Sequence, residues 1–405
     1  MLDDSDHRAI ARRLGLLHFQ EEAPGMVFWH PRGLAMYRAL EDAQRAQVRR
    51  EGYEEVRSPQ VMRRPMWEAS GHWKHFAEGM MRIQDDELEA ALKPVSCPGH
   101  VQIVKRMAPS YRDLPVRLAE LGVVHRDEAS GALHGLMRLR QFSQDDGHVF
   151  CEEAQAEDEV VRFLEGLRPF YAQFGFHELD VALSLRPEDR AGDDVVWDRA
   201  EALLARALDR RGEKHRVQEG AGAFYGPKIE IALRDRAGRL WQCGTIQMDL
   251  VMPVRFDLRY VDARGEKQPV VMLHRALYGS LERFLGILLE QHGASLPAWL
   301  APEQVVVVPV SGAQHENARA LARELERDGA RVSIDAREES LARRIAEAHE
   351  RGVPYVAIVG AREAERGEVA LRSRLLPESK GQRVMAIDAA RAYLREALVR
   401  PERAS

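Results

Sequence analysis

The most informative stretch of the chain is residues 123–151, VVHRDEASGALHGLMRLRQFSQDDGHVFC. Its pattern predicts a β-hairpin, with two glycines in a loop from Ala129 to about Met137. Because side chains at i, i+2 and i+4 of a strand share a face, the first arm places Arg126 beside Glu128. If the second arm stays extended, its one face carries Arg138, Arg140, Phe142, Gln144, Asp146 and His148, and the other carries Met137, Leu139 and Val149.

This polar face predicts a nucleotide-binding cleft. An ordinary polar strand face is solvated, but here the row includes a large aromatic ring and its opposite face is apolar. Arginine guanidinium groups bind phosphate, and an aromatic ring such as that of Phe142 stacks on a base. The chain has neither a GxxxxGK[ST] nor a GxGxxG phosphate loop, which argues against P-loop and Rossmann nucleotide sites.

Cysteine and histidine are the other residues that could do chemistry. Cys97, Cys151 and Cys243 are too far apart to form a disulfide framework. A single cysteine or histidine is usually a core or surface residue, and spacing alone groups none of them into a metal site. His148 and Cys151 form a local H-x-x-C pair, but residues i and i+3 of a strand point to opposite faces. We therefore do not expect that pair to share a metal.

The elements that position these residues follow from hydrophobic periodicity. Amphipathic helices are expected near residues 33–50, 153–174, 197–211 and 274–291, with hairpin-like stretches around 118–151 and 223–260. Hairpins separated by helices predict an α+β domain with an antiparallel sheet flanked by helices.

A domain boundary is expected at residues 295–302, SLPAWLAP, where two prolines interrupt the helical pattern. The segments after it alternate: strand 305–310, helix 314–328, strand 332–335, a helix ended by Gly352, strand 355–359, an edge strand at 369–374 and a last helix with Asp388 as N-cap. This order predicts a small α/β domain with a mixed, largely parallel sheet. The expected domains are therefore residues 1–298 and 299–405.

Composition narrows the class of protein. The chain has 405 residues, 45% of them apolar, and a net charge of −5, so it is neither disordered nor strongly basic. No run approaches the about 18 apolar residues of a membrane span, and the start MLDDSDHRAI lacks a signal peptide. We expect a soluble, cytoplasmic protein; a local basic patch would still be enough for a nucleic-acid partner.

HRDE followed by GLMRLRQF resembles motif 2 of the class II aminoacyl-tRNA synthetases. Other blocks narrow the resemblance to the threonyl-tRNA synthetase family: FQEEAPGMVFWHPRG, GYEEVRSPQVM, SGHWKHF, LKPVSCPGH, YRDLPVRLAELG, FYGPKIEI, WQCGTIQMDL and LHRALYGSLERFLGILLE. The resemblance covers residues 7–290 densely and the C-terminal domain more loosely. It implies the class II fold, activation of L-threonine by ATP with Mg²⁺, and transfer of threonine to its tRNA.

The resemblance also implies roles for single residues. Arg126 matches the arginine on the α-phosphate and the amino-acid carboxylate, and Arg283 matches the one at the γ-phosphate. Glu128, Arg138 and Phe142 match ATP contacts, and His72 and Lys228 match catalytic positions. Residues around the amino acid match Gln144, Asp146, Tyr225 and Gln247. Cys97, His148 and His274 match zinc ligands whose open fourth position takes the amino and hydroxyl groups of threonine, and Pro59 matches a proline at a homodimer interface.

The main departures from the family lie at the start of the chain and in the C-terminal domain. It starts at the catalytic domain, so the N-terminal editing region is expected to be absent. In the C-terminal domain, Glu338 stands where an anticodon-reading asparagine is expected and Ser340 replaces a basic residue, whereas Glu363 and Arg372 match anticodon contacts. Three alternatives to a standard synthetase stay open: a short form with relaxed anticodon reading, a paralogue that loads a carrier protein, and a non-catalytic tRNA-binding or regulatory paralogue.

Overall fold

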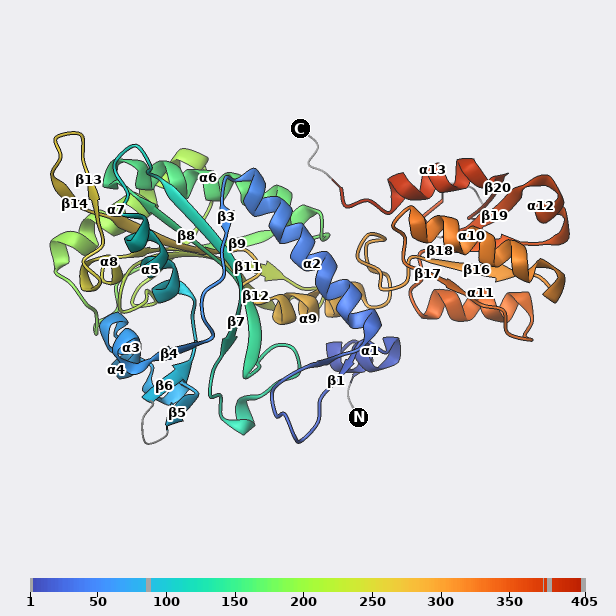
Figure 1. Ribbon diagram of the computed structural model, residues 1–405, viewed down its shortest axis with the longest axis horizontal. Helices are drawn as coiled ribbons and strands as arrows, with labels where there is room; N and C mark the ends of the chain where they lie inside the picture. The colour runs from blue at the N-terminus through green and yellow to red at the C-terminus, as the bar shows by residue number, and fades with distance from the viewer. Residues whose placement is uncertain (1–2, 85–88, 374, 377–380, 402–405) are drawn as a thin grey trace. The chain divides into compact units, whose positions relative to one another are not determined.

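The computed structural model describes residues 3–84, 89–373, 375–376 and 381–401 (Figure 1). Contacts divide the chain into two compact units. The larger unit comprises Phe19–Val27 and Glu41–Ile287, and the smaller unit comprises Met1–His18, Phe28–Leu40 and Leu288–Ser405. Among the described residues, no helix combines the length and apolar character needed to cross a bilayer.

The larger unit is built on an eight-stranded sheet. The outermost strand pair at each edge of the sheet is parallel, and all the strand pairs in between are antiparallel. The expected antiparallel-rich α+β fold is thus confirmed. In sheet order the strands are β10 (Arg216–Gln218), β9 (Leu179–Ser184), β11 (Lys228–Arg234), β12 (Leu240–Asp249), β15 (Val271–Ala276), β8 (Gln141–Cys151), β7 (Val116–His125) and β3 (Glu54–Glu55).

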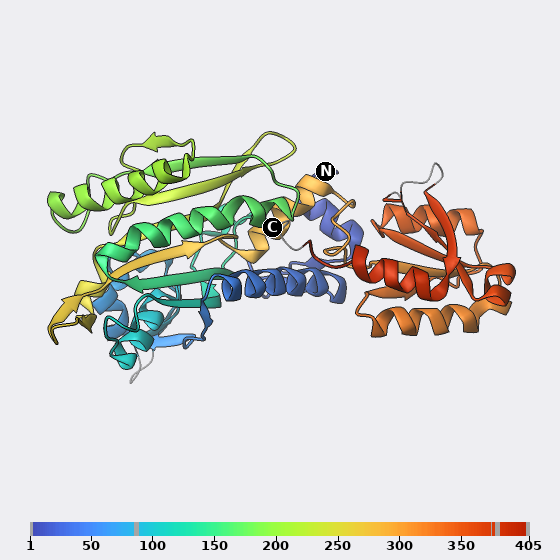
Figure 2. The same cartoon turned by 90° about the horizontal axis from the view of Figure 1, so that it is seen from above.

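Helices cover both faces of this sheet. Val101 and Val104 of α5 (Cys97–Met107) pack with Phe150 of β8 in one buried cluster. On the opposite face, Arg117 of β7 donates two hydrogen bonds to Glu159 of α6 (Glu153–Ala172). Helix α7 (Asp194–Arg211) packs beside α6 (Figure 2).

Local sequence fixes where these helices begin and end. Helix α6 begins at a capping box, in which Glu152 and Gln155 satisfy each other's backbone N–H groups. Helix α7 begins at Asp193, whose carboxylate accepts from Val196 N, and ends at Gly212 in the left-handed region. Helix α2 (Pro31–Arg50) has 20 residues, and α9 (Leu281–His292) has 12 and is buried along most of its length.

Smaller elements complete the larger unit. They are a sheet of β4 (Val61–Arg63), β6 (Glu89–Leu92) and β5 (Arg82–Gln84), a hairpin of β13 (Arg259–Val261) and β14 (Lys267–Pro269), and the short helices α3 (Arg64–Ser70), α4 (His72–His75), α8 (Met252–Arg255), η1 (Ala77–Gly79) and η2 (Ser130–Ala132).

Three of the four predicted helices are present, as α2, α6 and α7, but the fourth prediction was wrong in its first part. Residues 271–276 form strand β15, and helix α9 begins only at Leu281. The run VMLHRA pairs with β12 on one side and β8 on the other, so sheet pairing overrides the helical spacing. Gly279, with φ +75°, separates the strand from the helix. His274 consequently lies on a strand.

The smaller unit has a five-stranded mixed sheet, as expected. Its order is β17 (Val332–Ile334), β16 (Val305–Pro309), β18 (Tyr355–Val359), β19 (Glu368–Arg372) and β20 (Gln382–Ala386), with the first three parallel and the last two antiparallel. Helices α10 (His315–Arg327) and α13 (Ile387–Ala397) pack on one face and α11 (Leu341–Glu350) on the other. This unit also contains α1 (His7–Leu14), β1 (Leu17–His18), β2 (Phe28–Trp29), η3 (Gly312–Gln314) and α12 (Ala361–Arg366).

Two details of the smaller unit differ from the sequence prediction. Strand β19 is not at the edge, because β20 pairs with its outer side; residue 374 of the predicted strand lies outside the described residues. Helix α13 begins after Ala386, and Asp388 lies in its first turn rather than at the N-cap. A carboxylate in the first turn still interacts favourably with the helix dipole.

The core of the smaller unit gives a stability prediction. Leu325 of α10 is buried against the strands of the mixed sheet, so Leu325→Ala should lower the free energy of unfolding by about 2–5 kcal/mol through lost burial and a cavity. Arg323→Ala, on the exposed side of the same helix, should change it by less than about 0.5 kcal/mol. Denaturant unfolding followed by circular dichroism checks this; equal effects of the two variants would contradict the packing of Leu325 against the sheet.

Candidate active site

A cavity of about 520 Å³ lies in the larger unit over strands β8, β12 and β15. It gathers residues that are far apart in the sequence. From β8 come the even-numbered residues of the polar face, and from the β7–β8 connection come Arg126, Glu128 and Arg138. Of the residues predicted for the active site, those lining the cavity are His72, Cys97, Arg126, Glu128, Arg138, Phe142, Gln144, Asp146, His148, Tyr225, Gln247, His274 and Arg283.

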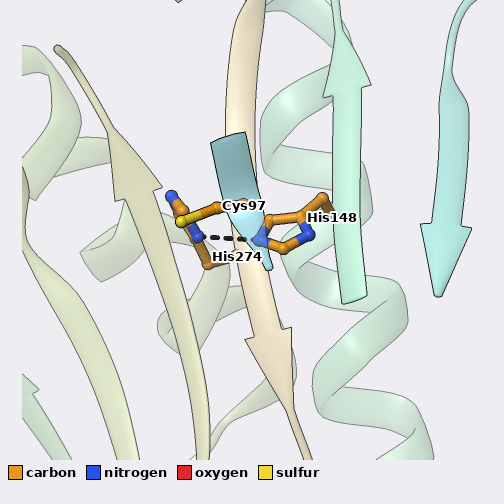
Figure 3. Close-up of side chains that lie close together, drawn as sticks. All are labelled: Cys97, His148 and His274. Atoms are coloured by element: carbon orange, nitrogen blue, oxygen red, sulfur yellow. Dashed lines mark hydrogen bonds between the residues drawn. The ribbon is translucent and has the colours of Figure 1, made fainter. Parts of the chain in front are cut away.

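One end of the cavity carries a cysteine–histidine cluster. Cys97 is the first residue of α5, and His148 of β8 lies directly opposite His274 of β15 in the strand pairing. One ligand atom from each of the three lies within 4.8 Å of the others. His148 Nε2 and His274 Nδ1 are 2.9 Å apart, and a dashed line joins them in Figure 3. Cys97 and His148 are buried and His274 is half-buried, so the cluster can hold a metal ion away from bulk water.

The surroundings of His274 fit a metal ligand. Its Nε2 lies 2.8 Å from Asp249 Oδ2, and the other Asp249 oxygen accepts from the backbone N–H groups of Val251 and Met252. Because a carboxylate only accepts, the ring proton belongs on Nε2 and the lone pair of Nδ1 points into the cluster. Metal-binding histidines commonly have such a carboxylate on the outer nitrogen.

The donor set indicates zinc. Thiolate and neutral imidazole are typical zinc ligands, and three protein ligands leave one position open. Burial lowers the pKa of His148 well below its ordinary value, which keeps the imidazole neutral. Burial also raises the pKa of the Cys97 thiol; a bound cation reverses this effect, because a coordinating thiol loses its proton.

A second group with the spacing of metal ligands, Asp6, His7 and Glu290, lies in the smaller unit. Its members are already engaged with one another and with Arg8. His7 Nδ1 is 2.7 Å from Glu290 Oε1, while Asp6 caps α1 and forms two side-chain hydrogen bonds with Arg8. We assign this group a structural role.

The other end of the cavity is cationic. Arg126 follows the end of β7, donates from Nε to Pro94 O at 3.3 Å, and lies over the ring of Phe142 with its guanidinium 5.1 Å from the ring centroid. Burial lowers its pKa, but arginine stays protonated in proteins. Arg283 lies near the start of α9, where its Nε donates to Met137 O at 3.1 Å. Two fixed cations beside an aromatic ring suit a nucleotide triphosphate.

The odd-numbered residues of β8 hold Arg283 in place. Asp145 is buried and accepts the backbone N–H groups of Leu277, Tyr278 and Gly279, which form the turn before α9. Burial raises its pKa to about 6, although these hydrogen bonds oppose the shift. Glu282 accepts from the backbone N–H of Ser143. Strand β8 thus faces the cavity with one set of side chains and fixes the start of α9 with the other.

The remaining cavity residues form a polar wall. The Tyr225 hydroxyl donates to Gln247 Oε1 at 3.3 Å, and Gln247 Nε2 donates to Gly226 O at 3.3 Å. Asp146 Oδ2 accepts from the Ser96 N–H at 3.3 Å. Gln144 Oε1 is buried and has no hydrogen-bond partner among the described residues, so a ligand that donates there would satisfy it.

His72 is neutral, and its Nε2 is arranged to accept a hydrogen bond. Burial lowers its pKa to about 4. The Ser70 hydroxyl donates to Trp67 O at 3.1 Å and lies 2.8 Å from His72 Nδ1. Since the single hydroxyl proton is used by Trp67 O, the N–H of His72 belongs on Nδ1 and its Nε2 is left as an acceptor.

Lys228 and Arg140 do not line the cavity. Lys228 Nζ pairs with Glu230 Oε1 at 2.8 Å. The placement of Arg140 on the cavity face was wrong: strand β8 begins only at Gln141, and Arg140 Nε donates instead to Glu128 O. Met137 and Leu139 were predicted on the face opposite the cavity, but they also line it, because residues before Gln141 are not part of the strand. The period of two holds only where the strand exists.

The predicted anticodon residues lie in the smaller unit but not at one edge. Exposed Glu338 follows β17, and half-buried Glu363 lies on α12 after β18, so both follow the carboxyl ends of parallel strands. Arg372 pairs with Val356 near the opposite end of β18. The exposed Pro59 lies between β3 and β4 of the larger unit.

Sequence reasoning missed the buried polar residues behind the cluster: Lys93, His100, Glu120 and Asp249. One signal was available, because Cys97 and His100 form a C-x-x-H pair on the first turn of α5, where i and i+3 lie close together. The partners on β7 and β12 carry no signal in the sequence pattern, since only the fold brings them to the cluster.

Comparison with known proteins agrees with this geometry. Residues 80–292 match the family described as tRNA synthetase class II core domain (G, H, P, S and T), and residues 304–397 match the family described as anticodon binding domain. Residues 80–292 contain seven of the eight strands of the large sheet, and they form a class II synthetase core.

Comparison with individual proteins identifies the family within the class II synthetases. The threonine–tRNA ligases of Marinobacter nauticus and Caulobacter sp. (strain K31) are 50% and 49% identical over 91% and 97% of this chain. The chain spans 58% and 59% of their own lengths. The solved structure of the RNA binding domain of threonyl-tRNA synthetase from Cryptosporidium parvum Iowa II is 39% identical, with a TM-score of 0.92 over 97% of this chain and 98% of that one. The chain belongs to the threonyl-tRNA synthetase family.

The wall around Tyr225 gives a second stability prediction. A Cβ on Gly226 would lie 1.6 Å from the Met248 carbonyl oxygen, so Gly226→Ala forces two backbone segments apart. We expect a loss of about 1–3 kcal/mol in the free energy of unfolding. Gly131→Ala is the matched control, because nothing lies within 4 Å of its Cβ. Thermal unfolding of both variants checks this; an unchanged midpoint for Gly226→Ala would contradict the close approach.

Proposed function

We propose that this chain activates L-threonine with ATP, forming threonyl-adenylate, and transfers the threonine to its tRNA. The observation that carries the proposal is that one cavity contains both the Cys97, His148 and His274 cluster and the cationic pair Arg126 and Arg283. A site for a hydroxy amino acid and a site for a nucleotide triphosphate therefore share one space, as the first step of the reaction requires.

At the cationic end, ATP with its Mg²⁺ is the proposed ligand. The ring of Phe142 stacks on adenine after the Arg126 guanidinium shifts toward phosphate, and Glu128 accepts from the adenine amino group. Glu128 is held by Arg138 at 2.8 Å, which keeps its carboxylate oriented. Arg126 and Arg283 stabilise negative charge on the α- and γ-phosphates as pyrophosphate leaves.

At the cluster end, threonine is the proposed ligand. A zinc ion held there would offer the amino and hydroxyl groups of the substrate the coordination space that the three protein ligands leave open. The chain's own residues complete the pocket: the unpartnered Gln144 Oε1 and the Asp146 carboxylate accept from the amino group, and Tyr225 and Gln247 limit the space around the side chain.

The proposal extends to the transfer of threonine to tRNA and to the binding partners of the protein. His72 Nε2, as an acceptor, takes the proton from the terminal ribose hydroxyl of tRNA. Lys228 reaches the adenylate only if its pair with Glu230 opens. The tRNA anticodon contacts residues 299–405 through Glu338, Glu363 and Arg372, while residues 1–298 do the chemistry. A homodimer forms around the exposed Pro59, and the cytoplasm is the proposed location.

Amino-acid selectivity tests the proposal. Valine lacks the hydroxyl, and a site built to bind that group rejects the analogue by about 10⁴-fold or more, whereas serine loses one methyl worth about 1–3 kcal/mol. In amino-acid-dependent ATP–pyrophosphate exchange, we expect threonine to be fastest, serine measurable and valine negligible. A valine signal comparable to serine would contradict hydroxyl recognition. Exchange without charging of threonine tRNA would favour the carrier-protein alternative.

The metal gives a second test. Purified protein should hold about one zinc per chain, and Cys97→Ala should lose both zinc and threonine activation because the cluster loses its thiolate. Cys151→Ala is the matched control. Like Cys97, Cys151 is a buried free cysteine, but it lies at the end of β8 and outside the cluster. Metal analysis by mass spectrometry decides. Stoichiometric zinc in Cys97→Ala would overturn the assignment of the cluster.

A further inference from the structure

A chain of hydrogen bonds leads from the outer nitrogen of His148 into the protein. His148 Nδ1 lies 2.8 Å from His100 Nδ1, and His100 Nε2 lies 3.2 Å from Glu120 Oε2. The other Glu120 oxygen accepts from Lys93 Nζ at 2.8 Å. The exposed fractions of His100 and Lys93 are 0%, and that of Glu120 is 3%. Three ionisable side chains in the interior are costly unless each is paired, and here each is.

Ser58 closes this chain at its inner end. Its backbone N–H and its hydroxyl donate to the two Glu120 oxygens at 3.0 and 2.8 Å, and Lys93 Nζ also donates to its hydroxyl at 2.9 Å. Gly99 allows this approach of α5, because a Cβ there would lie 2.5 Å from Ser58 Cβ. Glu120 therefore accepts from four groups and has no freedom to turn.

Glu120 is ionised at neutral pH. Burial alone would raise its pKa, but hydrogen bonds from His100 and Lys93 and the charge of Lys93 lower it to about 2. An ionised carboxylate only accepts, so His100 must carry a proton on Nε2. With the ring proton of His100 on Nε2, its Nδ1 keeps a lone pair, and this lone pair faces His148 Nδ1 at 2.8 Å.

The proton on His148 follows by the same rule. Since His100 Nδ1 accepts, His148 must donate from Nδ1, and its Nε2 keeps a lone pair. Because His274 donates its ring proton from Nε2 to Asp249, its Nδ1 also has a lone pair. The two lone pairs face each other, with His148 Nε2 and His274 Nδ1 2.9 Å apart. Two lone pairs at that distance repel unless a cation lies between them. The hydrogen bonds on both sides of the cluster thus point the two rings at one cation position.

We propose that Lys93, Glu120 and His100 form a positioning relay that fixes the tautomer and orientation of His148 as a metal ligand. The proposal rests on the metal cluster of the proposed function. None of the three residues touches the cavity, so they act through His148 and not on the substrate. Lys93 anchors the carboxylate, Glu120 sets the proton of His100, and His100 sets the proton of His148.

Three variants separate the relay from simple packing. Glu120→Gln is nearly isosteric but offers an amide N–H to His100 Nε2, which inverts the tautomers of His100 and then of His148. His100→Leu removes the acceptor for His148. His100→Gln restores an acceptor, because its amide oxygen can take the Nδ1 proton of His148. We expect zinc affinity to fall about 10–100-fold in the first two variants and less than about 10-fold in His100→Gln.

The readout is zinc affinity by competition with a chelator, together with the long-range ¹H–¹⁵N spectrum of the histidines in the zinc-loaded wild-type protein. The relay predicts a protonated Nδ1 and a metal-bound Nε2 on His148. Unchanged affinity in Glu120→Gln, equal affinity in His100→Gln and His100→Leu, or an unprotonated Nδ1 would overturn it. Wild-type protein that binds no zinc would instead overturn the metal part of the proposed function. The spectrum needs no variant, so the test stands even if His100→Leu does not fold.

Discussion

The antiparallel pairing of β8 with β15 is the constraint on which the rest of the site depends. Its register places His148 directly opposite His274. Because side chains alternate along a strand, a slip by one residue would move every side chain on the cavity face of β8 to the opposite face of the sheet. The same register brings Asp145 to the turn before α9 and so fixes the position of Arg283. One strand pairing thus positions both the cysteine–histidine cluster and the cationic end of the cavity.

Electrostatics explains why the buried groups around this strand pair are tolerated. Arg126 is desolvated but lies over an aromatic ring, and Asp145 is buried but accepts three backbone N–H groups. The Lys93–Glu120 pair is shielded from water, and Glu120 accepts four hydrogen bonds. Fixed groups of this kind need no reorganisation when charge develops on a substrate, which is the largest advantage that a preorganised site offers.

Sequence alone predicted those parts of the site that are local along the chain. The alternation in residues 138–149 indicated a strand with a polar cavity face, which holds from Gln141 onward, and the helices α2, α6 and α7 followed from periodicity. Spacing could not group the cluster, because 51 positions separate Cys97 from His148 and 126 separate His148 from His274. Only the resemblance to a known family supplied that set. Helical spacing also misled at residues 274–276, where pairing with two neighbouring strands decides the structure.

In the proposed function, His148, His274 and Cys97 hold one zinc ion over which threonine is selected. Anomalous diffraction at the zinc edge, from crystals grown with L-threonine, tests this proposal. We expect one anomalous peak per chain at about 2.0–2.3 Å from His148 Nε2, His274 Nδ1 and Cys97 Sγ. A zinc ion bound elsewhere, or bound through His148 Nδ1, would contradict it.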